Sequence, residues 1–255
     1  MALSVALVGC TVAQASVSGD GVIVIGVKAD QPGLGYREQG VFRGFEVDVG
    51  TYIARRLGAS RVRFREVRSD NRERKLNDHS VDLVLASYSI TPDRAKLVTF
   101  GGAYYVAHQD VMVRSGETAI RSVRDLAGRR MCKASGSVST ERVVKGLSIP
   151  ARLVPGSSYS DCVAKLRAGA VDAVSTGDLV LAGFAASDLH ILNQPFTDES
   201  YGVGMRKGEI DRCEKVNRAI TTMYQDGTAA KLLRKWFGKS RIPLVEEVPQ
   251  FEGCS

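Results

Sequence analysis

Short apolar runs alternate with an amphipathic segment in the first third of the chain. The expected strands cover residues 21–28, 62–67 and 81–85. The first run is apolar almost throughout, which is typical of a strand buried on both faces. Between the first two strands, residues 44–57 place Val49, Ile53 and Leu57 on one helical face. This strand–helix–strand order predicts an α/β fold built on a parallel sheet with right-handed crossovers.

Two extended segments, near residues 106–114 and 193–205, bracket a second unit with its own strands and helices. The expected strands of this unit are at 129–134 and 171–175, and helices at 210–225 and 228–236 end the chain. Two such crossings are what a clamshell with a two-stranded hinge requires. We therefore expect one lobe from residues 20–113 together with 200–255, and a second lobe from 114–199.

The first nine residues are apolar and small, and they lead into the sequence Leu7-Val8-Gly9-Cys10. This sequence resembles a bacterial lipobox, in which the cysteine carries the lipid. Nine residues are too few to span a bilayer. We therefore expect residues 1–19 to be a signal remnant and tether, with Cys10 holding the protein by its lipid on the extracellular face of the cell membrane. The alternative is a frayed N-terminus with a chance cysteine.

The four cysteines after Cys10 form no C-x-x-C pair, which argues against zinc and thioredoxin-type sites. Four cysteines allow three pairings. We favour Cys132–Cys162, which would tie a strand to a nearby helix. The second favoured pair is Cys213–Cys254, which would pin a proline-containing tail to a long helix. Each bond would contribute about 3–4 kcal/mol. The alternative, four free thiols in a cytosolic protein, fits poorly with a lipobox.

Composition and charge narrow the classes of function. The chain has 255 residues, of which 44% are hydrophobic and 25% charged, and it is long enough for two modest domains. Its formal net charge is +7, but it has no long basic run with interleaved aromatic residues. We therefore expect no nucleic-acid partner and attribute the excess to solvated surface charge. No motif of a hydrolase, zinc protease or phosphate-binding loop is present, and we expect no metal and no cofactor.

The densest candidate chemistry lies in residues 85–94, Leu-Ala-Ser-Tyr-Ser-Ile-Thr-Pro-Asp-Arg. The pattern predicts a strand end, a serine-rich turn and a helix start, because Thr91 is a good N-cap and Pro92 suits the first helical position. Arg94 would then lie beside free backbone N–H groups and hydroxyls, which together can hold a carboxylate. The alternative is an ordinary strand-to-helix connection with a surface arginine.

Two further segments are expected to face this stretch. Ligands of open parallel sheets bind at the carboxyl ends of the strands, where Lys28, Asp30 and Gln31 follow the first strand. Residues 135–141 form a small-residue turn that enters a helix, and its exposed N–H groups would make a second anion cradle. The alternatives are a solvated strand end for Lys28 and a common glycine- and serine-rich helix cap for the turn.

The order of these motifs resembles the family 3 extracellular solute-binding proteins, which serve polar amino-acid ABC importers. Within that family the chain most resembles the glutamate-binding lipoproteins of actinobacteria, including the placement of the four internal cysteines. The motifs that carry the resemblance are the lipobox, Lys28, Asp30-Gln-Pro32, Gly44-Phe-Glu-Val-Asp48, Ser89-Ile-Thr-Pro-Asp-Arg94, Phe100 with Tyr104-Tyr105, Val171-Asp-Ala-Val174 and Tyr201-Gly-Val-Gly204. The resemblance covers essentially the whole mature chain. It implies a two-lobed, periplasmic-binding-protein-like (type II) α/β fold.

The resemblance also implies roles for individual residues. Arg94 would clamp the α-carboxylate of the ligand through two parallel hydrogen bonds. Ser87 and Ser89 would contact the carboxylate and the ammonium group. The backbone amides of Val138 and Ser139 would close on the same carboxylate from the second lobe.

Side-chain recognition is expected at Lys28, which matches a position where relatives with acidic ligands carry a cation for the side-chain carboxylate. The weaker candidates for ligand contact are Asp30, Gln31, Tyr36, Phe45 and Tyr105, of which the three aromatic residues would form a wall.

One position departs from the family pattern. After the strand at 171–174 the family usually places an aspartate that takes the ligand α-ammonium. Aligned through Leu181-Ala-Gly183, that position is Gly177, and Asp178 lies one residue later, which turns a side chain by about 100° at a helix start. Either the loop shifts so that Asp178 substitutes, or the ammonium is held differently, or the ligand lacks a standard amino-acid head. A buried, unpaired ammonium would cost several kcal/mol.

Taken together, the resemblance implies a non-catalytic, extracellular receptor whose two lobes close on glutamate or a related acidic or polar amino acid. The closed form would be handed to permease subunits in the membrane, and we expect the receptor to be a monomer. One alternative is an enzyme of the cyclohexadienyl dehydratase type. That enzyme would need a general acid at the cleft, for which Asp30, Glu38 or Asp178 is available without an evident acid–base pair. Another alternative is a ligand sensor for a membrane partner.

Overall fold

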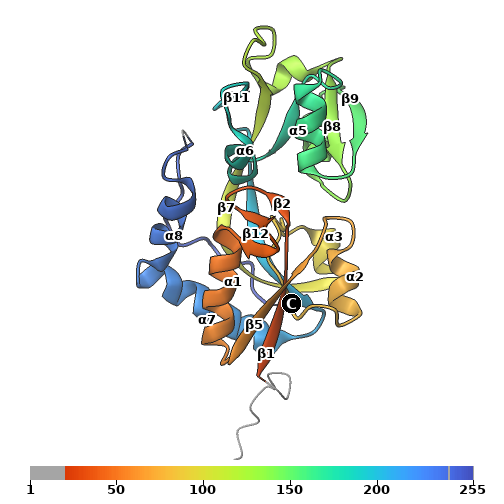
Figure 1. Cartoon of the computed structure of the whole chain (residues 1–255). Coiled ribbons are helices and arrows are strands. Elements are labelled where there is room, and N and C mark those ends of the chain that lie inside the picture. Colours follow the sequence, from red (N-terminus) through yellow and green to blue (C-terminus); the bar gives the residue numbers. More distant parts are fainter. Residues whose placement is uncertain (1–20, 241, 255) are drawn as a thin grey trace, which may run out of the picture.

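The computed structural model describes residues 21–240 and 242–254. The expected lipobox, its Cys10 and the tether therefore lie outside the described residues. Figure 1 shows two lobes joined by a pair of long strands, β7 (Val98–Arg114) and β12 (Thr197–Arg206). The two lobes and the two connecting strands confirm the two-lobed α/β architecture expected from the pattern of the chain.

The two lobes hold different sets of elements. The first lobe contains β1 (Val22–Val27), β5 (Arg61–Glu66), β6 (Leu83–Val84), α1 (Phe45–Arg56), α2 (Arg72–Asn77), α3 (Pro92–Ala95), α7 (Ile210–Gln225) and α8 (Thr228–Phe237). The second lobe contains a 3-10 helix (Val123–Leu126), β8 (Arg130–Ala134), α4 (Ser139–Glu141), a π-helical segment (Arg142–Gly146), β9 (Arg152–Gly156), α5 (Tyr159–Arg167), β10 (Val174–Gly177), α6 (Asp178–Phe184) and β11 (Leu189–Ile191). The helix expected at 210–225 is confirmed without a shift at either end.

One mixed sheet runs through both lobes, in the order β10-β7-β12-β6-β1-β5. The parallel arrangement expected for the first lobe is confirmed for β1, which pairs in parallel with β5 and β6. The connecting strands are antiparallel instead, from the pair Thr197–Gln109 to the pair Arg206–Val98, with an irregularity between Tyr201 and Val203. The two strands are antiparallel because the chain leaves the first lobe along β7 and returns along β12.

A small three-stranded sheet follows β1, in a part of the chain where no strand was expected. It consists of β2 (Asp30–Gln31), β3 (Gly35–Glu38) and β4 (Val41–Arg43). Strands of two to four residues are too short to show an alternating pattern in the sequence, and the small sheet was therefore missed.

Both favoured cysteine pairs lie at bonding distance. Cys132 and Cys162 join β8 to α5 with their Cα atoms 5.5 Å apart, and Cys213 and Cys254 join α7 to the C-terminal segment with Cα atoms 5.8 Å apart. Gly156 makes room for the first bond, because a Cβ there would lie 2.7 Å from each sulfur. Within residues 21–240 and 242–254, no helix has the length and hydrophobicity needed to cross a membrane.

Candidate functional site

Arg94 lies where the two lobes meet. Thr91 accepts a hydrogen bond from the Arg94 N–H through its side chain at 3.3 Å, and Pro92 is the first residue of α3, as the sequence predicts. The guanidinium is buried, with Nη1 donating to the Ser89 carbonyl at 2.8 Å and Nη2 donating to the Gly136 carbonyl of the second lobe at 3.1 Å. Burial, and next the charge of Arg72, lower the pKa of Arg94 to about 10. Arg94 is therefore a fixed cation at neutral pH.

The two serines before Arg94 point to different partners. Ser87 has a left-handed φ of 43°, its N–H donates to Glu46 Oε1 at 2.6 Å, and its hydroxyl donates to Gln31 at 3.2 Å. Ser89 is buried, and its hydroxyl donates to Glu199 Oε2 at 2.6 Å. Because a left-handed φ is unfavourable for serine, the bond to Glu46 is part of what holds this turn in place.

The turn at residues 135–139 of the second lobe lies over Arg94. Ser139 begins α4 and is buried, with its carbonyl accepting from Gln109 Nε2 at 2.9 Å. Ser137 and Ser139 both contact the Tyr159 hydroxyl, at 2.6 and 3.1 Å. Val138 precedes α4 and is half-buried. The structure thus places the turn at residues 135–139 next to Arg94, as expected for two segments that face each other.

At Gly136 the backbones of the two lobes come close together. The φ of Gly136 is 70°, and a Cβ there would collide with the backbone of Ser69 and lie 2.5 Å from the Asp70 nitrogen. Beside it, the Ser135 hydroxyl donates to Asp70 Oδ2 at 3.2 Å. Only glycine combines this backbone conformation with this separation.

Lys28 borders a cavity of about 180 Å³ between the lobes. Its lining includes Lys28, Asp30, Gln31 and Ser69 from the first lobe and Ser135, Tyr159 and Ser160 from the second. The Lys28 ammonium is buried and donates to Ser69 Oγ at 2.6 Å. Burial, and next the charge of Arg72, lower the pKa of Lys28 to about 7. The carboxylates of Asp30, Glu46 and Asp70 act in the opposite direction on this pKa. A ligand carboxylate in this cavity would lie beside the Lys28 ammonium.

Asp30 and Gln31 also line this cavity. Asp30 Oδ2 accepts from the Ser160 hydroxyl of the opposite lobe at 2.8 Å. Gln31 accepts from Ser87, so the cavity and the turn before Arg94 are joined by a hydrogen bond.

The expected aromatic wall differs from the arrangement observed. Tyr36 packs edge-on against Trp236 of α8, with ring centroids 6.3 Å apart. Phe45 is fully buried between Tyr104 and Tyr105 in the core. Neither side chain is among the residues that line the cavity. Tyr159 is the aromatic residue in the cavity lining, and the motifs gave no indication of it.

Gly177 and Asp178 lie where this sequence departs from the family pattern, at the position of the aspartate that usually takes the ligand ammonium. A Cβ at Gly177 would collide with the Tyr201 hydroxyl, so the tyrosine fills the space that a side chain would need. Asp178 begins α6, and its oxygens accept from the Leu179 N–H at 2.7 Å and from the Tyr105 hydroxyl at 3.1 Å. Burial raises the pKa of Asp178 to about 6.

Two buried glutamates near these residues were missed from the sequence. Glu46 is fully buried, and burial raises the pKa of its carboxyl group. It shares a helical face with the apolar Val49 and Ile53, which was the available signal. Glu199 is 2% exposed and forms an ion pair with Arg142 of the second lobe. Glu199 lies two residues before the buried Tyr201 on β12, so both side chains are on the same face of the strand.

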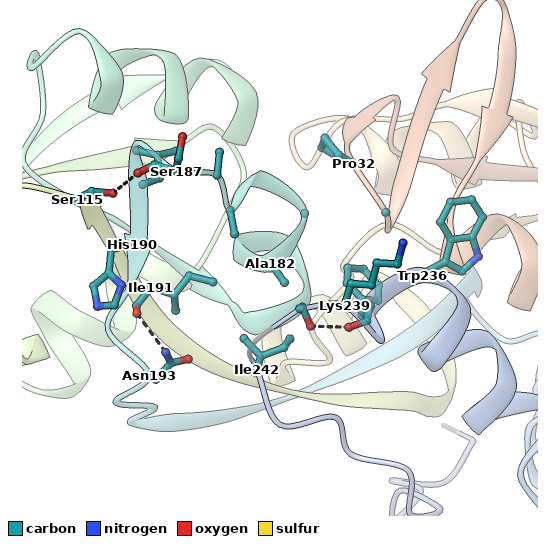
Figure 2. A pocket seen from close by; sticks show the side chains of 17 residues that line it. Pro32, Ser115, Ala182, Ser187, His190, Ile191, Asn193, Trp236, Lys239 and Ile242 are labelled. Atoms are coloured by element: carbon teal, nitrogen blue, oxygen red, sulfur yellow. Dashed lines mark hydrogen bonds between the residues drawn. The ribbon is translucent and has the colours of Figure 1, made fainter.

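A larger hollow of about 700 Å³ lies elsewhere, between α6 and β11 on one side and α8 with the residues after it on the other. Figure 2 shows Ala182 and Ile191 facing Pro32, Lys239 and Ile242 across it. None of its described lining residues is an acid or an arginine. The described lining therefore offers no carboxylate to the ammonium group of a zwitterion, whereas buried carboxylates, among them Glu46 and Glu199, lie in the region around Arg94 and Lys28.

Comparisons with known proteins show what the chain as a whole is similar to. A model of the bacterial extracellular solute-binding proteins, family 3, matches residues 23–239. The chain is 33% identical over 246 residues to the glutamate-binding protein GluB of Corynebacterium glutamicum, covering 90% of this chain and 83% of that protein. It is 29% identical to the ABC transporter glutamine-binding protein GlnH of Bacillus subtilis, covering 87% and 83% of the two chains. The structure of an ancestral arginine-binding protein bound to arginine is similar with a TM-score of 0.78 and 32% identity, covering 86% of this chain and 99% of that one.

Proposed function

This chain belongs to the bacterial extracellular solute-binding proteins of family 3, and we propose that it binds a free amino acid between its lobes for an ABC transporter. Its relatives are binding proteins, and the chain is accordingly a binding protein rather than an enzyme. The proposed ligand is glutamate or a related acidic amino acid, delivered to permease subunits in the membrane.

The observation that carries the proposal is the buried Arg94 guanidinium between the Ser89 carbonyl and the Gly136 carbonyl. An arginine at this junction can bind the α-carboxylate and draw both lobes onto it. The N–H groups of Val138 and Ser139 follow in the same turn and can add hydrogen bonds, that of Ser139 by giving up its bond to Ser137 Oγ at 3.2 Å. A contact that needs both lobes is available only when they are closed, so the ligand shifts the equilibrium toward the closed form.

The preference for an acidic side chain rests on Lys28. Its ammonium borders the cavity between the lobes, and a second ligand carboxylate would pair with it there. The name of the Corynebacterium relative, a glutamate-binding protein, supports this preference. The glutamine- and arginine-binding relatives indicate that side-chain selectivity varies on this fold.

Location and organisation complete the proposal. Proteins of this family are extracellular, and we propose that a lipid on Cys10 retains this one at the membrane surface. We further propose that it acts as a monomer, with residues 20–113 and 200–255 in one lobe and 114–199 in the other.

Calorimetric titration with a panel of amino acids tests the proposal. We expect glutamate to bind most tightly and Arg94→Ala to weaken it by about 2–5 kcal/mol, because the substitution leaves a buried carboxylate unpaired. The matched control is Arg74→Ala, since Arg74 is exposed on α2 and its ion pair is with the neighbouring Asp78. Equal affinities for Arg94→Ala and wild type would contradict the proposed clamp.

A further inference from the structure

We propose that Glu199 binds the α-ammonium group of the ligand and that Arg142 competes with the ligand for this carboxylate. The inference rests on the proposed function, because it assigns a partner to the one charge of an amino acid that Arg94 and Lys28 leave unmatched. A buried ammonium requires such a partner, since desolvation without one is unfavourable by several kcal/mol.

Glu199 lies on β12, one of the two strands that connect the lobes. It pairs with Ala107 of β7, and a Cβ at Gly177 would lie 3.1 Å from the Ala107 Cβ. Glu199 and Gly177 are therefore on the same face of the sheet, on either side of Ala107. The side chain of Glu199 is 2% exposed, so its charge is held away from bulk water.

Ser89 connects Glu199 with Arg94. The Ser89 hydroxyl donates to Glu199 at 2.6 Å, while the Ser89 carbonyl accepts from Arg94 at 2.8 Å. An anionic and a cationic side chain thus meet at one residue. The α-carboxylate and α-ammonium of an amino acid are attached to the same carbon atom, so their partners must adjoin in this way. The Ser89 hydroxyl can also accept a hydrogen bond from the ammonium.

The rival carboxylates are held by other donors. Asp178 accepts from its neighbour Leu179 and from Tyr105, whose hydroxyl lies beside the backbone of Val245 in the C-terminal segment. Glu46 accepts from the Ser87 N–H and from Tyr104 through Oε1, and both donors are in the first lobe. Its Oε2 is buried without a hydrogen bond among the described residues. Glu199 differs from them because its charge partner, Arg142, comes from the opposite lobe.

Arg142 provides the competition. It begins the π-helical segment Arg142–Gly146, its side chain is 24% exposed, and it forms an ion pair with Glu199. One buried carboxylate cannot pair equally well with two cations, because the cations repel each other. The partly exposed guanidinium can turn into solvent, whereas the ammonium of a bound ligand cannot. Binding an amino acid therefore exchanges one cation for another at Glu199.

The test is calorimetry with L-glutamate and with glutarate, which has both carboxylates but no amino group. We expect Glu199→Gln to weaken glutamate at least 100-fold and to lower the preference for glutamate over glutarate at least 30-fold. Glu199→Asp should recover part of the loss, because it keeps the charge. Asp178→Asn, the matched control for the rival carboxylate, should change both affinities less than fivefold. Arg142→Met should tighten glutamate about tenfold, since it removes the competitor.

Several results would overturn the inference. Glutamate binding by Glu199→Gln within threefold of wild type would do so, as would a selective loss in Asp178→Asn. Equal losses for glutamate and glutarate in Glu199→Gln would show a defect in closure instead of a lost ammonium contact. If Glu199→Gln does not fold, as judged by its thermal unfolding, unchanged or weakened glutamate binding in Arg142→Met contradicts the proposed competition. A wild-type protein that binds no amino acid overturns the proposed function, whereas the other results overturn only the role of Glu199.

Discussion

At the scale of single residues, Lys28 shows what the sequence can and cannot predict. Its place at the end of the first strand follows from the apolar run before it, and so does its position beside the cavity between the lobes. Its lowered pKa of about 7 does not, because that shift depends on burial by segments distant in the chain and on the charge of Arg72. Glu199 was missed for the same reason, since its partners Ser89 and Arg142 come from distant segments.

The pKa of Lys28 predicts how affinity depends on pH. A ligand carboxylate beside the ammonium would raise its pKa above about 7, so the complex binds a proton that the free protein has lost. The affinity for glutamate should therefore fall as pH rises above 7, by up to about tenfold per pH unit. Titrations at pH 6.5, 7.5 and 8.5 in buffers of different ionisation enthalpy measure both the affinity and the proton uptake.

Two controls isolate the lysine in that experiment. Glutamine has the same α-amino and α-carboxyl groups but a neutral side chain, so its affinity should not share this slope. Lys28→Met should remove the slope for glutamate. An identical pH dependence for glutamate and glutamine would show that another group titrates.

At the scale of elements, local signals predicted the helix starts well. Thr91 and Pro92 begin α3 as their N-cap and first-turn preferences require. The hydrogen bond from Arg94 to Gly136 could not be predicted in this way, because it joins segments from different lobes. The left-handed φ of Gly136 is likewise visible only in the folded chain.

Substitution of Gly136 should impair closure of the lobes. An added Cβ would collide with Ser69, and we expect Gly136→Ala to weaken glutamate at least tenfold and to shift the protein toward an open form with a larger radius of gyration in the presence of ligand. The matched control is Gly128→Ala, because Gly128 has a similar φ of 71° in the same lobe but no atom within 4 Å of its Cβ position. If both variants bind alike, the close approach at Gly136 does not limit closure.

At the scale of the whole molecule, the two long crossings of the chain were visible in the sequence as extended segments. Their antiparallel pairing within one mixed sheet was not, because strand partners are set by tertiary packing. The position at Gly177 shows the same limit. The sequence revealed that a carboxylate was missing there, but only the structure reveals that the Tyr201 hydroxyl fills the space.

The two disulfides should stabilise the lobes without taking part in binding. Cys213 and Cys254 close a loop with a sequence separation of 41 residues and pin the C-terminal segment to α7. We expect Cys213→Ser with Cys254→Ser to cost about 3–4 kcal/mol and to lower the Tm by roughly 10 °C. Differential scanning calorimetry measures the shift, and the glutamate affinity at 25 °C should stay within about threefold of wild type. An unchanged Tm would mean that the bond adds nothing to the folded state.

We expect the two lobes to rotate about the antiparallel ladder of β7 and β12. Because both connecting strands belong to it, a rotation of one lobe moves each contact in proportion to its distance from the ladder. Glu199 is on β12 itself and moves least, whereas the exposed Ser135–Asp70 pair at the rim moves further. As the lobes part, the hydrogen bond between Ser135 and Asp70 therefore breaks before the contacts of Glu199 do. Release of the ligand is therefore expected to begin at Ser135 and Asp70 and to reach Glu199 last.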